Sequence, residues 1–269
     1  MKISICGFGN VGGALYSYIA PGCPHEVSIY DPQKGRHDDI SKTEVNFISV
    51  TAPTKGFKVD LTNIEHCLKR TSPDSINFIR STVTPGTCDA LMKKHNKLVI
   101  SMPEFLTQRQ ARSDFKKIPI LFGGRGTNHK SRISYAMGLV FPKKRMKQMT
   151  NKECELAKLA HNNLAALKVM YANSIWDICQ IHKCSYEDVK AGMLLSGLFS
   201  KNHLQVPGPD GYMGFGGVCL PKDQESFIGW IDQCAGKHGL MKVLMDCYTL
   251  NRAQRGIKEV PTTVGHHSV

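Results

Sequence analysis

The sequence lacks an uninterrupted apolar run long enough to cross a membrane, and its N-terminus lacks the charged-then-apolar layout of a secretory signal. We therefore expect a soluble, cytoplasmic protein with no membrane partner. Its ten cysteines are scattered through 269 residues, without the dense spacing of a small disulfide-stapled domain. They are expected to be reduced thiols. The chain also contains no internal repeat and no extended low-complexity segment.

Zinc-finger spacing, an aromatic RNA-binding signature and a long basic tail are missing too. Lys and Arg nevertheless outnumber Asp and Glu by 35 to 22, a formal charge of +13, which suits either nucleic acid or a phosphorylated small molecule. The basic residues are spread out, apart from short runs such as 143–145, where a solvated surface is the simpler interpretation. We expect no nucleic-acid partner and no bound metal.

The first half of the chain alternates strands and helices. Residues 2–20 combine an apolar strand, a glycine turn and an amphipathic helix, and a second strand at 26–31 ends in an acid. Further strands are expected at 45–50, 76–80, 98–101 and 118–122. This alternation predicts an α/β fold with a Rossmann-like, doubly wound parallel sheet.

The second half is expected to be helical. Residues 151–183 carry apolar residues at helical spacing without Pro or Gly and predict one long central helix. The Gly- and Pro-rich stretch 206–221 predicts a loop, and residues 223–256 predict further helix, broken near Gly236 and Gly239. The expected domains are a nucleotide-binding domain over 1–148, a helical domain over 149–256 and a tail over 257–269.

A glycine triplet marks a candidate dinucleotide site. Gly7, Gly9 and Gly12 form GxGxxG between a strand and a helix, where the backbone can approach a pyrophosphate. Asp31 ends the second strand, where a carboxylate can bind the ribose hydroxyls and repel a 2′-phosphate. These residues favour NAD over NADP, while an FAD site and a turn without a ligand remain alternatives.

Four segments, in order, resemble the UDP-glucose/GDP-mannose dehydrogenase family: RSTVTPGT at 80–87, MPEFL at 102–106, LAKLAHNNLAALKVMYAN at 156–173 and GFGGVCLPKD at 214–223. The resemblance extends to about residue 256. It implies an NAD-dependent nucleotide-sugar 6-dehydrogenase that converts UDP-glucose to UDP-glucuronate, with GDP-mannose or another nucleotide sugar as the alternative substrate. It also implies a homodimer formed through the central helices. A non-catalytic relative that binds NAD or a nucleotide is the competing interpretation.

Oxidising a primary alcohol to an acid removes two hydrides, with an addition between them. The resemblance assigns that addition to Cys219, whose thiolate would form a thiohemiacetal and then a thioester. A buried, inert cysteine is the alternative. Lys158 and Asn162 are four residues apart and would share a helix face aimed at an oxyanion, unless they form a solvated stripe.

The remaining catalytic roles also follow from the resemblance. Asp223 would be the base, Thr82 would hold a water, and Glu104 would be a second carboxylate of the site unless it only favours a helix start. The predicted catalytic residues are Cys219, Lys158, Asn162, Asp223, Thr82 and Glu104. The predicted cofactor-binding residues are Gly7, Phe8, Gly9, Asn10, Val11, Gly12, Asp31, Thr51, Pro53 and Thr82. The predicted substrate-binding residues are Glu104, Phe105, Leu106, Lys158, Asn162, Asn202, His203, Phe215, Gly216 and Cys219.

The sequence departs from the family pattern in four places. Gln108 stands where the family has a second glutamate that orders the hydrolytic water, and an amide cannot serve as a base. Ser174 replaces the acid that follows Asn173, and the stretch LSGLFSKNH lacks the usual arginine. The sequence also stops before the family's C-terminal nucleotide-binding domain, so a short form is expected.

Overall fold

The computed structural model describes residues 1–21, 24–106, 111–235 and 238–257. The chain folds as two compact units. The first consists of Met1–Pro53 and Val59–Lys158, and the second of Thr54–Lys58 and Leu159–Val269. The domain limits expected from the sequence, after residues 148 and 256, stay predictions.

A six-stranded sheet forms the centre of the first unit. Its strand order is β3-β2-β1-β4-β7-β8, and every pair is parallel except β2 with β3. The strands are β1 (Lys2–Cys6), β2 (Glu26–Asp31), β3 (Arg36–His37), β4 (Val45–Ile48), β7 (Ile76–Ile79) and β8 (Leu98–Ser101). In register, Ile5 lies opposite Phe47, and Phe47 lies opposite Phe78. The short helix η1 (Pro32–Lys34) joins β2 to β3.

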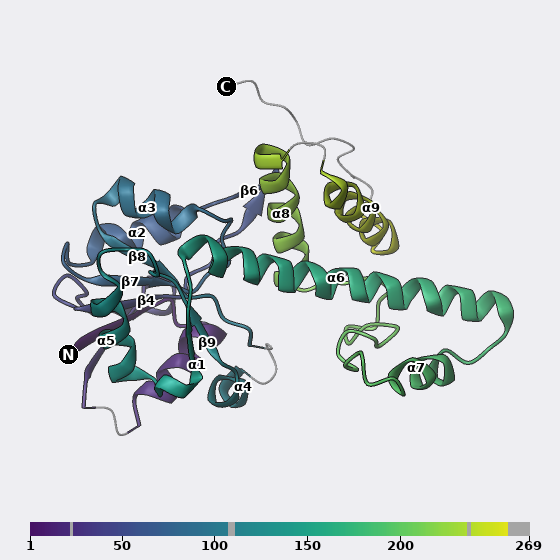
Figure 1. The fold of residues 1–269 in the computed structure, drawn as a ribbon, viewed down its shortest axis with the longest axis horizontal. Coiled ribbons are helices and arrows are strands. Elements are labelled where there is room, and N and C mark those ends of the chain that lie inside the picture. Colours follow the sequence, from purple (N-terminus) through teal and green to yellow (C-terminus); the bar gives the residue numbers. More distant parts are fainter. Residues whose placement is uncertain (22–23, 107–110, 236–237, 258–269) are drawn as a thin grey trace. The chain divides into compact units, whose positions relative to one another are not determined.

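Helices cover both faces of this sheet (Figure 1). Side chains along a strand alternate between the two faces, and buried apolar side chains lie on each. One face packs against α1 (Asn10–Ile19), α4 (Ala111–Lys117) and α5 (Lys130–Val140). The other packs against α2 (Thr62–Arg70) and α3 (Thr87–His95). Apolar strands buried on both faces are typical of doubly wound sheets, so the predicted fold class is confirmed.

A row of polar side chains crosses three strands inside the second of these cores. Ser4 Oγ donates to Asn46 Oδ1 at 2.5 Å, and Asn46 Nδ2 donates to Asn77 Oδ1 at 3.1 Å. Asn77 Nδ2 then donates to the Leu98 carbonyl at 3.2 Å. Ser4, Asn46 and Asn77 are fully buried, so their polar groups depend on one another for hydrogen bonds.

Three predicted strands need correction. The strands expected at 45–50 and 76–80 end at Ile48 and Ile79. The strand expected at 118–122 begins at Ile120, because Pro119 has no N–H to donate to a ladder. This strand, β9 (Ile120–Phe122), pairs with β10 (Met146–Gln148) in a separate parallel sheet, after the short helix η2 (Lys143–Arg145).

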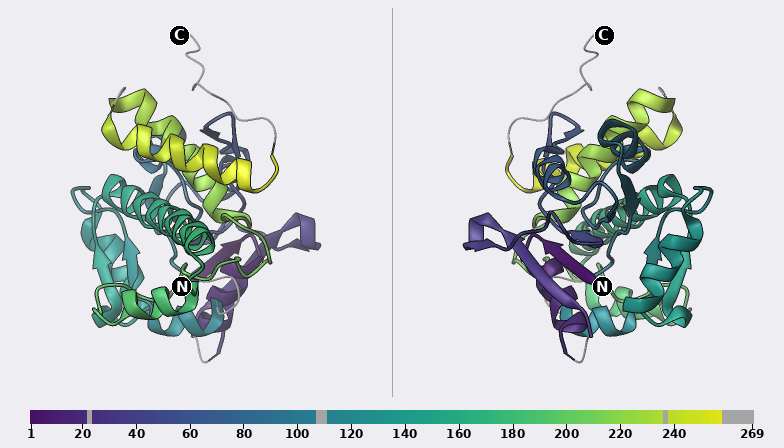
Figure 2. Two further views of the ribbon diagram at one scale, coloured as in Figure 1. Left: turned by 90° about the vertical axis from the view of Figure 1, so that its right-hand side faces the viewer. Right: turned by 90° about the vertical axis from the view of Figure 1, so that its left-hand side faces the viewer.

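The second unit is mainly helical. It contains most of α6 (Asn151–His182), together with α7 (Tyr186–Leu194), α8 (Cys219–Ala235) and α9 (Gly239–Gln254). Helices α8 and α9 lie side by side (Figure 2) and share a core with Leu159 and Phe57. The segment with β5 (Thr54–Lys55) and the start of β6 (Lys58–Val59) approaches α8 at Gly229, where a Cβ would lie 2.1 Å from the Phe57 carbonyl oxygen.

The long helix predicted over 151–183 is confirmed, since α6 ends one residue earlier. The loop predicted over 206–221 is too long, because α8 already begins at Cys219. Pro221 is compatible with this earlier start, since the first turn of a helix leaves N–H groups unused. Of the expected tail, Ile257 alone lies among the described residues.

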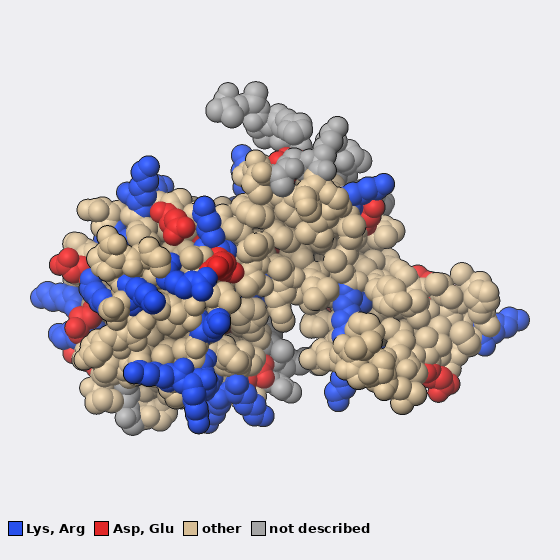
Figure 3. All heavy atoms as spheres, viewed as in Figure 1, with Lys and Arg blue, Asp and Glu red and all other residues tan. Residues whose placement is uncertain are grey.

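Charges of both signs are mixed on the face of the first unit seen in Figure 3. Two of its ion pairs are Lys94 with Glu65 at 2.7 Å and Arg125 with Glu153 at 2.6 Å. No helix in the described part of the chain is both long and apolar enough to cross a membrane.

Candidate functional site

The three glycines of the N-terminal turn have different surroundings. Gly7 has φ +85°, and a Cβ there would lie 2.8 Å from the Ser49 backbone. A Cβ on Gly12 would lie 1.9 Å from the Gly7 carbonyl oxygen, whereas one on Gly9 would meet no atom within 4 Å. Gly7 and Gly12 are therefore required by the fold, and Gly9 leaves the backbone open to a ligand, as a pyrophosphate-binding turn requires.

The start of α1 adds to this cradle. Its first residues are Asn10 and Val11, its N-cap is Gly9, and its first turn holds no acid. A helix N-terminus of this kind presents N–H groups and a positive dipole end to an anion. The residues present therefore fit a dinucleotide phosphate.

Asp31 lies beside the glycine turn, as predicted. It ends β2, and its Oδ2 accepts a hydrogen bond from the Phe8 N–H at 2.7 Å. The Phe8 carbonyl accepts from Lys34 Nζ at 2.8 Å, and the Arg36 guanidinium lies 5.0 Å from the Phe8 ring centroid. The carboxylate is thus held at the end of β2, where a ribose would be bound.

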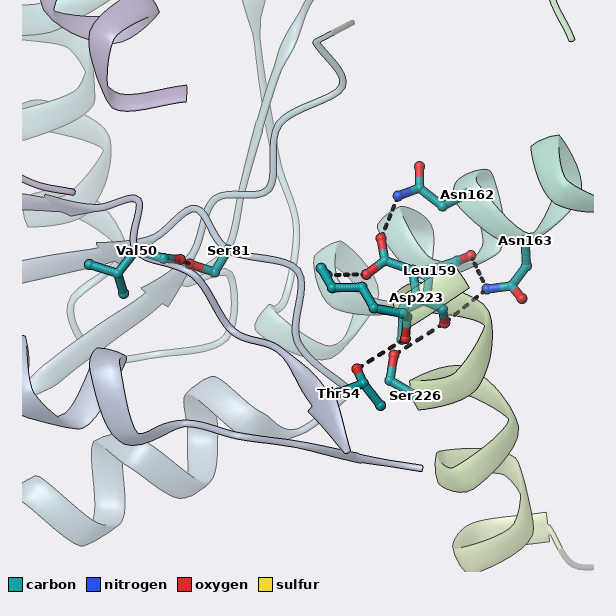
Figure 4. A network of polar contacts seen from close by, with 9 residues as sticks. Val50, Thr54, Ser81, Leu159, Asn162, Asn163, Asp223 and Ser226 are labelled. Atoms are coloured by element: carbon teal, nitrogen blue, oxygen red, sulfur yellow. Dashed lines mark hydrogen bonds and ion pairs between the residues drawn. The ribbon is translucent and has the colours of Figure 1, made fainter. Parts of the chain in front are cut away.

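The other predicted residues of the first unit follow strand ends at the same edge. Thr51 and Pro53 come after β4, Thr82 after β7 and Glu104 after β8. The Ser81 hydroxyl joins two of these loops by donating to the Val50 carbonyl at 2.5 Å (Figure 4). β1 pairs with β2 on one side and with β4 on the other. The order in which successive strands are added to the sheet therefore reverses beside β1, and parallel sheets of this kind bind ligands at such a point.

A small pocket adjoins Glu104, with Arg80 in its lining. Arg80 is 3% exposed, and its Nε and Nη1 have no hydrogen-bond partner among the described residues. Burial lowers the pKa of Arg80 to about 10, although the Glu104 carboxylate acts in the opposite direction. Sequence reasoning missed Arg80, and the signal was a charge directly after a strand in which every residue is buried.

The predicted substrate residues at 104–106 are linked to the beginning of α6. Glu104 Oε2 accepts from the Leu106 N–H at 2.5 Å, and Lys158 Nζ lies 5.1 Å from the Phe105 ring centroid. Lys158 is buried. The ammonium is therefore held beside the MPEFL segment, within the first unit.

Glu155, one turn before Lys158, is a second residue that sequence reasoning missed. Its carboxylate accepts from the N–H groups of Gly86 at 2.6 Å and Cys88 at 2.8 Å, at the N-terminus of α3. Burial raises the pKa of Glu155 to about 7. This residue ties the helix that carries Lys158 to the segment that carries Thr82.

In the second unit, Asn162 and Asp223 are brought together. Asn162 Nδ2 donates to Asp223 Oδ2 at 2.5 Å, and Lys222 pairs with the other carboxylate oxygen (Figure 4). Asn163 Nδ2 donates to the Leu159 carbonyl at 2.9 Å and to the Asp223 carbonyl at 3.4 Å. Asp223 is 1% exposed, so these contacts fix its position.

Cys219 is exposed and is the first residue of α8. The helix has no acid in its first turn, so its N-terminal dipole stabilises a thiolate. Burial raises the pKa of two other cysteine thiols, that of Cys154 to about 12 and that of Cys88 well above its ordinary value. Phe215, four residues before Cys219, is buried, and Gly216 follows it.

The other predicted positions are less constrained. Asn202 and His203 lie exposed between α7 and α8, and His203 has φ +65°. Ser174 donates to the Met170 carbonyl of its own helix at 3.0 Å. Gln108 lies outside the described residues. No group of three His, Cys, Asp or Glu side chains suited to a metal occurs in the described ranges.

Comparison with known proteins identifies relatives. Residues 152–251 match the central domain of the UDP-glucose/GDP-mannose dehydrogenase family. The chain is 27% identical over 280 residues to UDP-glucose 6-dehydrogenase of Rattus norvegicus, a match that covers 82% of this chain and 56% of the rat protein. This chain therefore spans little more than half the length of that relative.

Solved structures confirm the fold. A UDP-glucose dehydrogenase from the archaeon Pyrobaculum islandicum superposes with a TM-score of 0.77 at 21% identity, covering 93% of this chain and 68% of that one. The 3-hydroxyisobutyrate dehydrogenase of Mycobacterium tuberculosis superposes with a TM-score of 0.71 at 17% identity, covering 94% of each chain. Since the same fold serves different named dehydrogenases, it does not select a substrate. The match at residues 152–251 confirms the resemblance of this chain to the UDP-glucose/GDP-mannose dehydrogenase family.

Proposed function

We propose that this chain is an NAD-dependent nucleotide-sugar 6-dehydrogenase that oxidises UDP-glucose to UDP-glucuronate through a covalent adduct of Cys219. The observation that carries the proposal is the exposed Cys219 thiol at the first residue of α8, within the stretch 152–251 that matches the family's central domain. A thiolate at a helix N-terminus is a suitable nucleophile for an aldehyde.

The cofactor would be held by the turn at Gly7, Gly9 and Gly12, by the first residues of α1 and by Asp31, with Thr51, Pro53 and Thr82 along the same sheet edge. Bound NAD would accept a hydride in each of two oxidations, a second NAD replacing the first after reduction. The open space at Gly9 and the position of Asp31 at the end of β2 support this assignment.

The chain's own residues would supply the remaining chemistry. Asp223, held by Asn162 and Lys222, would take the proton from the C6 hydroxyl, with a water on Thr82. The Cys219 thiolate would then add to the aldehyde carbon. Oxidation of this thiohemiacetal gives a thioester, and water cleaves the thioester to the acid and the thiol.

Negative charge develops on the sugar oxygen in these steps. The Lys158 ammonium and the second N–H of the Asn162 amide are the donors that we propose for it. Glu104 would order water for hydrolysis, with its carboxylate near the buried Arg80.

The test is to mix the protein with NAD and a panel of nucleotide sugars and to follow NADH absorbance. UDP-glucose is expected to yield two NADH per molecule consumed, and Cys219→Ser is expected to stop acid formation while the folded protein still binds NAD. Undiminished glucuronate production by Cys219→Ser would rule out the assigned nucleophile. GDP-mannose tests the alternative substrate.

A non-catalytic role is the second candidate, because Gln108 has an amide where the family has a glutamate that orders the hydrolytic water. A relative of this kind would bind NAD or UDP-glucose in calorimetry without producing NADH. Turnover of any nucleotide sugar would exclude it.

The exposed face of α6 supports a homodimer. Leu164, Tyr171 and Ile178 recur every seven residues and are 68%, 57% and 49% exposed, and Ile181 continues the stripe at 75%. We propose that this stripe packs against the same helix of a second copy.

The nine cysteines of the described ranges are thiols, which supports a reducing, cytoplasmic location.

A further inference from the structure

The backbone just before Cys219 is held by buried amide side chains from two helices. The Gly214 N–H donates to Asn173 Oδ1 of α6 at 2.9 Å, and the Phe215 N–H donates to Asn251 Oδ1 of α9 at 2.7 Å. Asn173 is 1% exposed and Asn251 is 4% exposed. Two consecutive N–H groups of the loop thus depend on two side chains that water does not reach.

Arg255, at the end of α9, holds the same loop from another direction. Its Nη2 donates to the Gly214 carbonyl at 3.1 Å, and its Nη1 pairs with Asp210 at 2.7 Å. The glycines permit this approach: a Cβ on Gly214 would lie 2.4 Å from Asn251 Oδ1, and one on Gly216 would lie 2.7 Å from Arg255 Nη1. Gly214 and Gly216 therefore let polar side chains touch the backbone.

Phe215 supplies the apolar anchor. Its ring is 4% exposed in a cluster with Ala166, Val169, Met170 and Cys247. After it come Gly216 and Gly217, the latter at φ +75°, and glycines restrict the backbone least of all residues. Shortly before the thiol, the chain is therefore fixed at Phe215, by its buried ring and by its hydrogen bond to Asn251.

We propose that Asn251 is a positioning residue for Cys219: by holding the Phe215 N–H, it sets where α8 begins and keeps the sulfur at the helix N-terminus. This inference rests on the proposed function, in which Cys219 is the nucleophile. Without the acceptor oxygen, the first turn of α8 shifts or frays, and the thiolate loses the N–H groups that stabilise it.

The test measures alkylation of Cys219 by iodoacetamide at pH 7, followed by peptide mass spectrometry, with exposed Cys184 as the internal reference. Asn251→Ala is expected to lower the Cys219-to-Cys184 rate ratio about threefold, through loss of thiolate. Asn251→Asp keeps an acceptor oxygen and is expected to restore the ratio. Leu250→Ala, at an exposed neighbour on α9, is the control and is expected to leave it unchanged.

An unchanged or higher ratio in Asn251→Ala overturns the proposal, and so does an equal fall in Asn251→Asp. If Asn251→Ala does not fold, Arg255→Lys decides. This variant, at the C-cap of α9, loses the hydrogen bond from the guanidinium to the Gly214 carbonyl. Its Cys219-to-Cys184 rate ratio must also fall.

Turnover separates the two claims. In an active enzyme, Asn251→Ala is expected to lower kcat about tenfold or more with little change in the KM for NAD. If neither the wild-type protein nor any variant turns over a nucleotide sugar, but the alkylation ratios fall as expected, the positioning role stands and the proposed function fails. If the enzyme turns over and the ratios do not move, the positioning role fails alone.

Discussion

At the residue scale, the three turn glycines separate a requirement of the fold from a requirement of the ligand. Gly7 and Gly12 have backbone atoms where a Cβ would stand, but Gly9 and Gly13 have none within 4 Å. Gly9 differs from Gly13 in its place: it is the N-cap of α1, whereas Gly13 lies inside that helix.

We therefore expect Gly9→Ala to fold normally and to weaken NAD binding about tenfold, because its methyl group enters the space left for the pyrophosphate. Gly13→Ala is the matched control. It should leave the affinity for NAD unchanged and raise the stability of α1 slightly. Isothermal titration calorimetry and thermal melting measure both effects, and equal NAD affinity in the two variants would contradict the assignment of the turn.

Glu155 gives the first unit a pH-dependent stability. Burial raises its pKa from 4.5 to about 7, so the folded chain binds a proton that the unfolded chain releases. The stabilisation is complete below about pH 4.5 and is lost as the pH rises through about 7. Its upper limit is about 3.5 kcal/mol, since one pKa unit corresponds to about 1.4 kcal/mol.

We expect Glu155→Gln to remove this pH dependence. The melting temperature of the variant, relative to that of the wild type, should therefore rise between pH 5 and pH 8. Glu153→Gln is the control, because Glu153 is exposed on the same helix and its pKa is lowered, chiefly by the Thr150 N–H. Differential scanning fluorimetry across the pH range measures the difference. Parallel curves for wild type and Glu155→Gln would show that Glu155 does not titrate there.

At the element scale, α6 carries both the predicted site residues and the predicted dimer stripe, on different faces. Leu164→Glu combined with Ile178→Glu places charges in the stripe, so light scattering should give half the mass of the wild-type dimer. Gln180→Glu adds one charge to an exposed position outside the stripe and should stay dimeric. A wild-type monomer would refute the dimer itself.

The elements were predictable where a pattern is local. Strands buried on both faces and a helix without Pro or Gly gave limits within about two residues. Pairing was not predictable for β9, because a three-residue apolar strand suits any neighbouring sheet. The start of α8 was missed because glycines and prolines around Cys219 also fit a loop.

Contacts of the site were less accessible to sequence reasoning. The hydrogen bond between Asn162 and Asp223 joins residues 61 positions apart, and no local period encodes it. The family motif supplied both residues but not their contact. Arg80, Glu155 and Asn251 act through burial, which depends on the packed fold.

At the scale of the whole molecule, the two units have separate cores, and the predicted cofactor residues all lie in the first. We expect NAD to slow amide hydrogen exchange at residues 7–12 and at the end of β2, because binding raises the cost of opening those segments. Exchange in α7 should stay the same and serves as the internal control. Unchanged exchange at residues 7–12 would contradict NAD binding at the glycine turn.

The buried row of Ser4, Asn46 and Asn77 also governs how strands find their partners during folding. A strand displaced by two residues would still turn its apolar side chains inward, so hydrophobic burial alone would not prevent this incorrect register. The displacement would, however, separate Asn46 Nδ2 from Asn77 Oδ1, and each of these buried atoms would lose a hydrogen-bond partner at a cost of about 1–3 kcal/mol. The row thus selects one alignment among several that hydrophobicity accepts, and this alignment sets the level at which the loops after β1, β4 and β7 leave the sheet.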